Sequence, residues 1–474
     1  MSKSKTTSKH TNGAGKSLAA RLRAVLPSRI ISETAEDLAF HAKDKWFASH
    51  PPDAVVFAET TEQVSKVMKF ATRHKIPVTA RGGGAGYVGG CVPMHGGVAL
   101  SLARMNRIKE IHVTDGVAVV EPGVITGTLQ DAVRAQGLFY APDPASLRDS
   151  SIGGNIATNA GGPRCLKYGV TRTSVLGLEV VLADGSVVRC GGRTIKNKTG
   201  FDIVGLFVGS EGLLGVVTEA TLRLLPLPPA RAVVSASFPT FRAAAEAVQA
   251  VFAAGLVPAC LEIADAFTLE AARQYLGKQV APGAKAQLIA ELDGQSESVR
   301  SEMKALLKLL KNCGALKMAT GHGEKACEAL WGLRRAYSAS LKATGLTKLN
   351  EDIVVPRGSL VALVEFGERL SAKYGIPVAC FGHAGDGNIH VNLMAKHYHE
   401  DQKVHAKVNK ALDELFREVL RLGGAVTGEH GIGLAKARWW PLAVSPATRQ
   451  THEILKKALD PLGILNPGKF VQGA

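Results

Sequence analysis

The sequence is poor in cysteine and has no long apolar run. Its seven cysteines are scattered, their number is odd, and no two of them form a C-x-x-C pair. This pattern supplies neither a disulfide framework nor the thiolates of an iron–sulfur cluster, and it is typical of a reducing compartment. No apolar stretch reaches the roughly 18 residues needed to cross a bilayer. We therefore expect a cytoplasmic protein without a membrane-spanning helix.

Aromatic residues are scarce, and so are acidic residues near the start of the chain. Aromatics make up 5% of the sequence and are not interleaved with basic residues, which argues against nucleic-acid binding. The first 30 residues carry seven Lys and Arg and no acidic residue. We predict that residues 1–30 form a basic, disordered tail, in which residues 16–26 could make a short amphipathic helix. Peripheral contact of this tail with an anionic membrane, and a role as a transit peptide, both stay open.

The chain of 474 residues is long enough for two or three domains. A strand, a helix and a second strand are predicted within residues 54–80, because the helical stretch places its apolar residues along one face. Three prolines between residues 226 and 229 mark a boundary, after which strands and helices follow the order βαββαβ. This order predicts an antiparallel sheet with helices on one side, and hence an α+β fold.

The stretch RGGGAGYVGG, residues 81–90, is the first of three glycine-rich segments. It contains a G-x-G-x-x-G match, which in a nicotinamide-binding turn is followed at once by a helix. Here Gly89, Gly90 and Pro93 follow, so no helix can begin. We interpret the loop as a nest of backbone N–H groups for a pyrophosphate, with Arg81 adding positive charge.

The other two glycine-rich segments are SIGGNIATNAGG, residues 151–162, and GSEGLLGVVT, residues 209–218. The small side chains of the first segment let the backbone approach a flat ligand closely. The second segment is predicted to be a phosphate- or sugar-facing loop that runs into a strand.

The stretch FGHAGDGNIHVN, residues 381–392, combines a tight turn with a polar strand face. Polar and apolar residues alternate from Asn388 onward, so Asn388, His390 and Asn392 should share one face of a strand. The glycines before them allow a reversal that brings His383 back over this strand. A glycine-rich hairpin with incidental histidines is the alternative, but two imidazoles on opposite arms of one turn favour a site.

An acid and a third histidine stand side by side in TGEHGIG, residues 427–433. Together, His383, His390 and Glu429 would give a divalent metal three ligands and leave positions open for a substrate. The neighbouring His430 is then free to act as a general base, because histidine titrates near neutrality. The alternative for this pair is an ordinary loop beside a helix N-terminus.

Taken together, these motifs resemble the FAD-linked oxidase family with a flavin domain of the vanillyl-alcohol-oxidase, or PCMH, type. The similarity covers residues 45–470 and rests on the glycine-rich segments, on KTGFD at 198–202, and on the pair GHAGDGNIH and GEHGIG. It implies a split FAD-binding domain at 31–228 and a ferredoxin-like α+β cap domain for the substrate at 229–422. A C-terminal helical segment, 423–474, would carry Glu429 and His430 back to the flavin.

The resemblance also implies roles for individual residues. The residues that it places against FAD are Arg81, Gly82, Gly83, Gly84, Ala85, Gly86, Tyr87, Pro142, Asp143, Ser146, Gly153, Gly154, Asn155, Asn159, Gly161, Glu211, Gly212, Gly215, Val217 and Asn466. It assigns a divalent metal, zinc or manganese, to His383, His390 and Glu429. It assigns the catalytic base to His430, and the substrate carboxylate to Arg334, Lys348 and Asn392.

Some relatives bind the flavin covalently through a histidine in the glycine loop. Ala85 stands at that place here, so we expect noncovalent FAD.

Within the family, the chain is similar to D-2-hydroxyacid dehydrogenases that act on D-lactate, glycolate or D-2-hydroxyglutarate. The implied reaction oxidises the hydroxyacid to the 2-oxoacid by metal-assisted proton abstraction and hydride transfer to flavin N5. The implied partners are an external electron acceptor (an electron-transfer flavoprotein, a quinone, a cytochrome or an iron–sulfur subunit) and a second copy of the chain in a homodimer. Two alternatives stay open: an enzyme like alkyldihydroxyacetonephosphate synthase, and a non-catalytic subunit that holds flavin for a larger oxidase complex.

Overall fold

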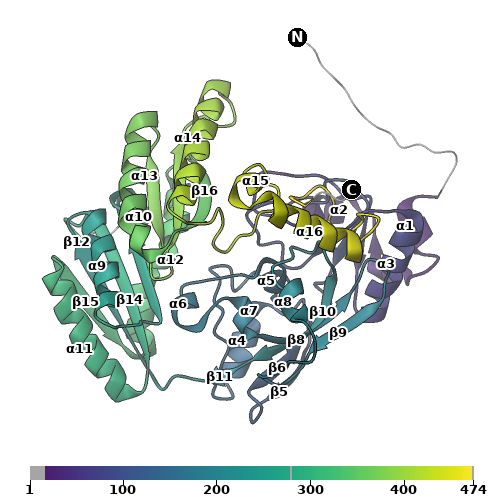
Figure 1. Ribbon diagram of the computed structural model, residues 1–474, viewed down its shortest axis with the longest axis horizontal. Coiled ribbons are helices and arrows are strands. Elements are labelled where there is room, and N and C mark those ends of the chain that lie inside the picture. Colours follow the sequence, from purple (N-terminus) through teal and green to yellow (C-terminus); the bar gives the residue numbers. More distant parts are fainter. Residues whose placement is uncertain (1–15, 278–279, 472–474) are drawn as a thin grey trace.

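The computed structural model describes residues 16–277 and 280–471 and has two halves, each built on β-sheets (Figure 1). The α+β class expected from the sequence is confirmed. The helices of the first half are α1 (Leu18–Leu22), α2 (Ala35–His41), α3 (Thr61–His74), α4 (Thr126–Arg134), α5 (Ile152–Thr158), α6 (Cys165–Tyr168), α7 (Thr171–Ser174) and α8 (Ile203–Phe207), with a 3-10 turn η1 at Ser28–Ile30.

A four-stranded sheet begins the first half, in the order β1 (Ile31–Ser32), β2 (Ala54–Phe57), β4 (Val98–Ser101), β3 (Val78–Arg81). The strands β2 and β3 both pair in parallel with β4, as the predicted strand–helix–strand start requires. Helix α3 begins at the Thr60 cap and buries Val64, Val67, Met68 and Ala71 against this sheet. The apolar face predicted for this helix is confirmed.

A five-stranded antiparallel sheet completes the first half, in the order β5 (Ile108–His112), β6 (Val117–Val120), β10 (Val216–Arg223), β8 (Val175–Val181), β9 (Val187–Gly191). A short pair, β7 (Leu138–Phe139) with β11 (Leu225–Pro226), lies beside it. Helices α4 and α5 pack their apolar residues into the same core. Helix α5 falls in the second glycine-rich segment, where no helix was predicted from the sequence. The prediction missed it because two glycines near its start lower the helix propensity of the segment.

The second half is built on a seven-stranded antiparallel sheet. Its order is β15 (Lys317–His322), β12 (Ala230–Phe238), β14 (Ala286–Gly294), β13 (Cys260–Ala264), β17 (Val378–His383), β18 (Asn388–Ala395), β16 (Thr347–Val354). The first four strands have the ferredoxin-like arrangement, with β12 and β14 between β15 and β13. The hairpin β17–β18 and the strand β16 then extend the sheet beyond β13.

Helices cover both faces of this sheet, so the expectation of helices on one side alone is wrong. Helices α9 (Phe241–Ala253), α11 (Ser296–Asn312), α13 (Leu360–Tyr374) and α14 (Gln402–Arg421) share the larger core on one face, with a 3-10 turn η2 at Arg357–Ser359. Helices α10 (Ala266–Leu276) and α12 (Gly323–Ala343) pack on the other face, against Phe381 and Met394. The sequence did not predict α10. Strand β18 is therefore buried on both faces, with Ile389, Val391 and Leu393 in the larger core, as predicted for these three residues.

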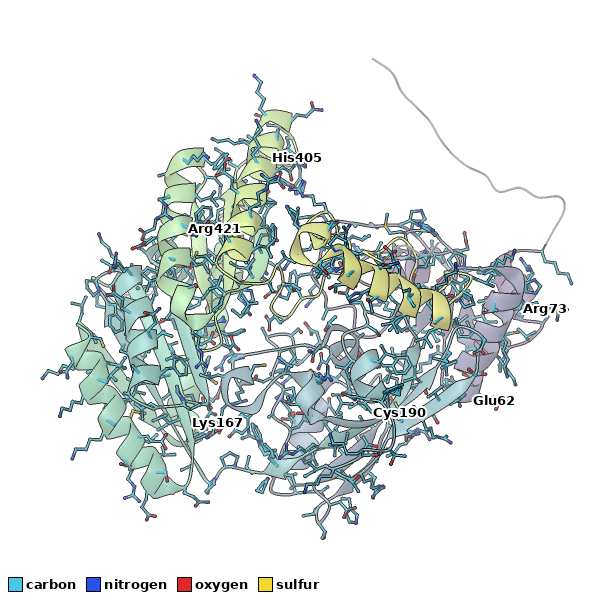
Figure 2. The ribbon with its side chains drawn as sticks, viewed as in Figure 1. Glu62, Arg73, Lys167, Cys190, His405 and Arg421 are labelled. Atoms are coloured by element: carbon cyan, nitrogen blue, oxygen red, sulfur yellow. The ribbon has the colours of Figure 1, made fainter. Side chains whose placement is uncertain are left out.

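The C-terminal segment runs back to the first half (Figure 1). It leaves the second half beside β16, where Ala425 pairs with Val354, and it carries α15 (Trp440–Ala443) and α16 (Pro446–Leu459). It then reaches β3, where Leu465 pairs in parallel with Val78. A second link between the halves is Lys167 (Figure 2), whose Nζ donates a hydrogen bond of 2.7 Å to the carbonyl oxygen of Asp293 on β14.

The disorder predicted for residues 16–30 is wrong, but the short amphipathic helix considered within residues 16–26 is present as α1. Residues 1–15 lie outside the described residues. Helix α1 and the turn η1 are ordered, and Ala19, Leu22 and Ile30 are fully buried in the core beside β2. The basic residues around them favoured a solvated segment, whereas the apolar face of this short helix is buried in the core. Within the described part of the chain, no helix is long and apolar enough to cross a membrane.

Replacement of Leu22 by alanine tests whether this segment is part of the fold. We expect Leu22→Ala to lower the free energy of unfolding by about 2–5 kcal/mol, because a fully buried leucine is lost. Val25→Ala is the control, since Val25 is 45% exposed and its loss should cost less than about 0.5 kcal/mol. Equal unfolding midpoints of the two variants in denaturant would contradict a packed N-terminal helix.

Candidate flavin, metal and substrate site

A first cavity lies along the three glycine-rich segments of the first half. Of the residues that the resemblance assigns to FAD, those that line it are Gly82, Gly83, Gly84, Ala85, Gly86, Tyr87, Ser146, Gly153, Gly154, Asn155, Gly161, Glu211, Gly212, Gly215 and Val217. The glycine loop lies directly on the start of α5, where the Gly83 N–H donates a hydrogen bond of 3.1 Å to Ser151 Oγ. A Cβ atom at Gly83 would clash with the backbone carbonyl oxygen of Asp149, so this close approach requires glycine. The segments therefore form a long backbone-walled slot.

Five residues of that assignment do not line the slot. The Arg81 guanidinium lies beneath the glycine loop and donates a hydrogen bond of 2.6 Å to the Lys43 carbonyl oxygen, so it supports the loop from behind. The Asn466 side chain donates hydrogen bonds of 2.9 Å to the carbonyl oxygens of Gly90 and Glu211, which joins two of the segments. The other three are Pro142, Asn159 and Asp143, of which Asp143 lines the second cavity.

Glu211 lines the slot and also contacts the C-terminal segment. Its backbone is in the left-handed region, with φ of 51°, and its carboxylate accepts hydrogen bonds from the N–H groups of Ile432 (2.7 Å) and Gly433 (2.8 Å). This carboxylate therefore faces the C-terminal segment, and it fastens the loop that follows His430 to the slot.

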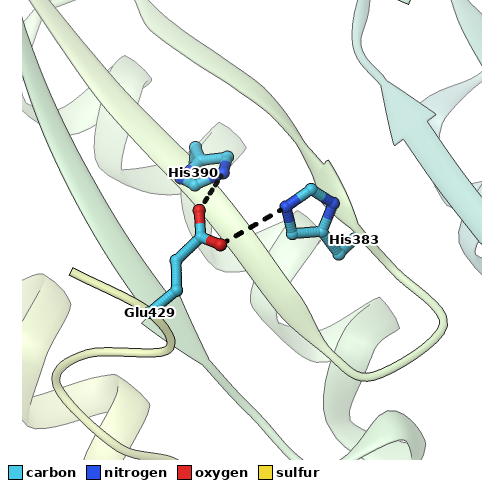
Figure 3. Close-up of side chains that lie close together, drawn as sticks. All are labelled: His383, His390 and Glu429. Carbon is cyan, nitrogen blue, oxygen red and sulfur yellow. Dashed lines mark ion pairs between the residues drawn. The ribbon is translucent and has the colours of Figure 1, made fainter. Parts of the chain in front are cut away.

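The predicted metal ligands lie together (Figure 3), and one of them, Glu429, also lines the slot. One ligand atom from each of His383, His390 and Glu429 can be chosen so that all three lie within 4.8 Å of one another. The Glu429 carboxylate is 3.8 Å from His383 Nε2 through one oxygen and 3.5 Å from His390 Nε2 through the other. The hairpin β17–β18 accounts for the histidine pair, whose ring centroids are 5.5 Å apart.

The electrostatics of these three residues suit a cation. Burial alone would raise the pKa of Glu429, but the neighbouring imidazoles, His383 first, lower it to about 2. Burial lowers the pKa of His390 to about 3, so this ring is neutral. Burial acts in the same direction on His383, yet the Glu262 and Glu429 carboxylates raise its pKa well above the ordinary value. A divalent ion held by two imidazoles and a carboxylate would replace the proton on His383, so the residues fit a metal.

The loop that carries Glu429 and His430 is held by one buried carboxylate. Asp352 on β16 is fully buried, and its Oδ2 accepts hydrogen bonds from the N–H groups of Gly428 (3.0 Å), Glu429 (2.9 Å) and His430 (2.9 Å), and from Thr427 Oγ1 (2.8 Å). Burial would raise the pKa of Asp352, but His430 and Lys436 hold it well below its ordinary value. Four donors on one oxygen fix the loop next to β18, because Asp352 pairs with His390 across the strands.

A second cavity, of about 650 Å³, meets the slot at this loop. The residues that line both cavities are Tyr87, Pro144, Ala145, Ser146, Glu429 and His430. The His430 ring stacks between Tyr87 and His390, with centroid distances of 5.6 Å to each. A ligand in the second cavity and a flavin in the slot would therefore meet at His430.

Two of the three predicted carboxylate contacts line this second cavity. Arg334 and Lys348 lie over the Phe381 ring, with their charged groups 4.8 and 5.6 Å from its centroid. Lys348 donates a hydrogen bond of 2.9 Å to Ser338 Oγ and has no carboxylate partner within the described ranges. Burial, with the nearby Lys342 and Arg334, lowers its pKa to about 7. An anion placed here would meet the Arg334 guanidinium and would favour the protonated form of Lys348.

The third predicted contact, Asn392, is not on the cavity wall. It is fully buried, and its Nδ2 donates hydrogen bonds to the carbonyl oxygens of Ala379 (2.9 Å) and His390 (3.0 Å). Asn350, its pairing partner on β16, lines the cavity instead. Asn392 was predicted to bind substrate because it stands two residues beyond His390 on the same face of β18. In the fold, this end of the strand face does not reach the second cavity.

Sequence reasoning missed Glu262 on β13. This carboxylate is 1% exposed, and its two oxygens contact His383 Nδ1 and Arg334 Nε, both at 2.6 Å. Its only signal in the sequence is an acid inside an otherwise apolar strand, LEIA. Burial would raise the pKa of Glu262, but His383 and Arg334 lower it to about 2.

Comparison with known proteins agrees with this architecture. The family model described as "FAD binding domain" matches residues 52–191, and the one described as "FAD linked oxidases, C-terminal domain" matches residues 227–470. The chain belongs to the FAD-linked oxidase family. It is an FAD-binding oxidoreductase, which confirms the resemblance stated from the motifs.

Two relatives cover most of this chain. The glycolate oxidase subunit GlcD of Bacillus subtilis (strain 168) is 40% identical over 419 residues, which are 88% of this chain and 89% of that protein. The D-lactate dehydrogenase of Anaerostipes hadrus is 32% identical over 461 residues, which are 95% of this chain and 96% of that protein.

Two solved structures share the fold. One is p-cresol methylhydroxylase with substrate bound, at 22% identity and a TM-score of 0.78, where the match covers 96% of each chain. The other is alkyldihydroxyacetonephosphate synthase, at 19% identity and a TM-score of 0.73, where it covers 95% of this chain and 84% of that one. Both likenesses show the fold alone, and the predicted PCMH-type flavin fold is thereby confirmed.

We predict that FAD is held without a covalent bond, because the glycine loop has Ala85 where a linking histidine would stand. Precipitation of the purified protein with acid should release a yellow flavin into the supernatant. Flavin that stays with the washed pellet, seen by its fluorescence on a denaturing gel, would contradict this prediction.

Proposed function

We propose that this protein is an FAD-dependent dehydrogenase that oxidises a D-2-hydroxyacid, of the D-lactate, glycolate or D-2-hydroxyglutarate class, to its 2-oxoacid. The observation that carries the proposal is the position of His430 and Glu429 on the wall common to the flavin slot and the second cavity. There a candidate base, a candidate metal site and two cations for a carboxylate converge. The names of the relatives, glycolate oxidase subunit and D-lactate dehydrogenase, support this substrate class.

The residues of the second cavity would divide the work as follows. Arg334 and Lys348 bind the carboxylate of the acid and turn its α-carbon toward the slot. His383, His390 and Glu429 would hold a divalent ion, zinc or manganese. When bound, FAD supplies a two-electron acceptor and the metal supplies Lewis acidity.

His430 would remove the hydroxyl proton. Its Nε2 is 3.7 Å from Glu429, on the side of the metal site, whereas its Nδ1 is 4.0 Å from the Asp352 carboxylate. We assign the incoming proton to Nε2, because the buried negative charge of Asp352 then stabilises the imidazolium that forms. Tyr87 and His390 on either side keep the ring plane fixed.

The division of the chain follows from these roles. Residues 31–228 would hold FAD, residues 229–422 the substrate, and residues 423–474 would bring Glu429 and His430 to the flavin. The ordered residues 16–30 belong with the flavin half, since they pack into its core.

An external acceptor would reoxidise the flavin. An electron-transfer flavoprotein, a quinone, a cytochrome and an iron–sulfur subunit are the candidates. Two relatives, from Bacillus subtilis and Escherichia coli, are named as subunits of a glycolate oxidase, which supports assembly with other chains. A homodimer is a further part of the proposal, as is a peripheral contact with a membrane.

The two alternatives are weaker. An enzyme like alkyldihydroxyacetonephosphate synthase shares the fold, but the convergence of His383, His390 and Glu429 with two cations favours a small hydroxyacid. A subunit that only holds flavin would not require a base on the wall between the slot and the cavity.

Turnover with an artificial dye as electron acceptor tests the proposal. D-lactate, L-lactate, glycolate, D-2-hydroxyglutarate and its L isomer are supplied in turn, and dye reduction is followed. We expect reduction with at least one D acid or glycolate, loss of activity on chelation, and recovery with Zn²⁺ or Mn²⁺. No dye reduction with any acid by FAD-loaded, metal-supplemented protein would contradict the proposal.

The role of His430 has its own test. His430→Asn should keep FAD and metal and lose about 10² to 10⁴ in turnover rate, as the removal of a general base does. His405→Asn is the matched control, because His405 is exposed on α14 (Figure 2) and should leave turnover unchanged. Turnover of His430→Asn within twofold of wild type at neutral pH would remove His430 from the mechanism.

A further inference from the structure

Glu262 lies at the centre of the second half and joins two groups that the proposed function treats separately. It stands on β13, between β14 and β17, and its carboxylate is shielded from solvent. One oxygen contacts the ring of His383, a metal ligand in the proposal, and the other contacts Arg334, a carboxylate-binding residue in the proposal.

We propose that Glu262 is a positioning residue that sets both the metal-binding tautomer of His383 and the orientation of the Arg334 guanidinium. This inference rests on the proposed function, because it assigns Glu262 a part in the same site. Glu262 does not line the second cavity, so it would act through the two residues that do.

The contact with His383 selects which ring nitrogen can bind a metal. Glu262 Oε1 lies 2.6 Å from Nδ1, so Nδ1 carries the hydrogen that the carboxylate accepts. The lone pair is then on Nε2, which faces Glu429 at 3.8 Å. A carboxylate behind a metal-bound histidine fixes its tautomer and its orientation in this way, and it makes the ring a stronger ligand.

The contact with the second oxygen of Glu262 fixes the orientation of the Arg334 guanidinium. Glu262 Oε2 accepts a hydrogen bond of 2.6 Å from Nε. Within the described ranges this is the one hydrogen bond of the Arg334 side chain, so the two Nη groups remain for an anion. The guanidinium carbon stands 4.8 Å from the Phe381 ring centroid, so the side chain is held between the carboxylate and the ring.

A carboxylate can serve both neighbours at once, but a carboxamide cannot. Both oxygens of Glu262 accept, whereas glutamine offers one acceptor and one donor. If its amide NH₂ faced His383, Nδ1 would have to accept and Nε2 would carry the hydrogen, which prevents metal binding. If its NH₂ faced Arg334, two donors would meet and the guanidinium would turn away. Glu262→Gln must therefore disturb at least one of the two functions.

The experiment compares Glu262→Gln with Glu291→Gln. Glu291 is also 1% exposed, lies on the adjacent strand β14, and bonds Arg231 and Trp331 but no histidine. Zn²⁺ affinity is measured on metal-stripped, FAD-loaded protein against a competing chelator. KM and kcat are measured with dye for whichever of D-lactate, glycolate and D-2-hydroxyglutarate the wild type oxidises.

We expect Glu262→Gln to bind Zn²⁺ about 10- to 100-fold more weakly, or to raise KM about tenfold, or both, with the flavin spectrum unchanged. Glu291→Gln should bind Zn²⁺ as the wild type does. Arg334→Met separates the two arms: it should raise KM but keep Zn²⁺ affinity within about threefold, because Glu262 still accepts from His383. If Glu262→Gln does not fold, Glu262→Asp takes its place, since its carboxylate keeps the charge but is too short to reach both partners.

Different results would contradict the role of Glu262 and the proposed function. A wild-type protein that binds Zn²⁺ and oxidises an acid, with a folded Glu262 variant that has the same Zn²⁺ affinity and KM, would overturn the role of Glu262 alone. A wild-type protein that binds neither Zn²⁺ nor Mn²⁺ would overturn the proposed metal site and this inference with it.

Discussion

The buried carboxylate of Asp352 is the interaction on which the rest of the site depends. One of its oxygens accepts four hydrogen bonds from residues 427–430, and the other accepts one from Asn388 at the start of β18. The same residue therefore holds the loop with Glu429 and the strand with His390. Buried N–H groups without an acceptor are costly, so the loop has one favourable position, and that position brings Glu429 to the two histidines.

The second constraint is the junction between the halves. The C-terminal segment is fastened on one side by Asp352 and on the other by the Glu211 carboxylate, which binds the backbone just beyond His430. His430 thus lies between two carboxylates from different halves, the buried Asp352 and the half-buried Glu211. The slot and the second cavity meet there, because the linking loop that lines both belongs to neither sheet. Binding residues on a loop positioned by rigid elements are common in enzymes.

Much of this arrangement could be predicted from the sequence, and the exceptions have physical reasons. The period of two in NIHVN and the glycines before it predict the meeting of His383 with His390, since a hairpin is a local structure. The approach of Glu429, about 40 residues later, was inferred from its residue type beside His430 and from the resemblance, because no local pattern sets a long-range contact. Glu262 and Asp352 gave little signal: Glu262 is a single acid in an apolar strand, Asp352 follows another acid in β16, and only their neighbours in space show what they bind. An amphipathic helix near residues 16–26 could be predicted, but the burial of Ala19 and Leu22 could not, because the basic residues around them favoured a solvated segment. Asn392 shares a strand face with His390, but it is buried away from the second cavity, and the sequence pattern does not show how deep a residue lies.

The most direct test of this account is metal content and turnover in Asp352→Asn, with Asp265→Asn as the control. An asparagine cannot accept the same set of hydrogen bonds, so the loop should lose its position while the flavin slot keeps FAD. Asp265 is a buried carboxylate that caps α10 and bonds Thr268 and Cys380, away from the loop. We predict that Asp352→Asn, with a wild-type flavin spectrum, holds less than about one-tenth of an equivalent of zinc or manganese and loses about 10² or more in turnover. Asp265→Asn should keep its metal. A full equivalent of metal and wild-type turnover in Asp352→Asn would contradict the account.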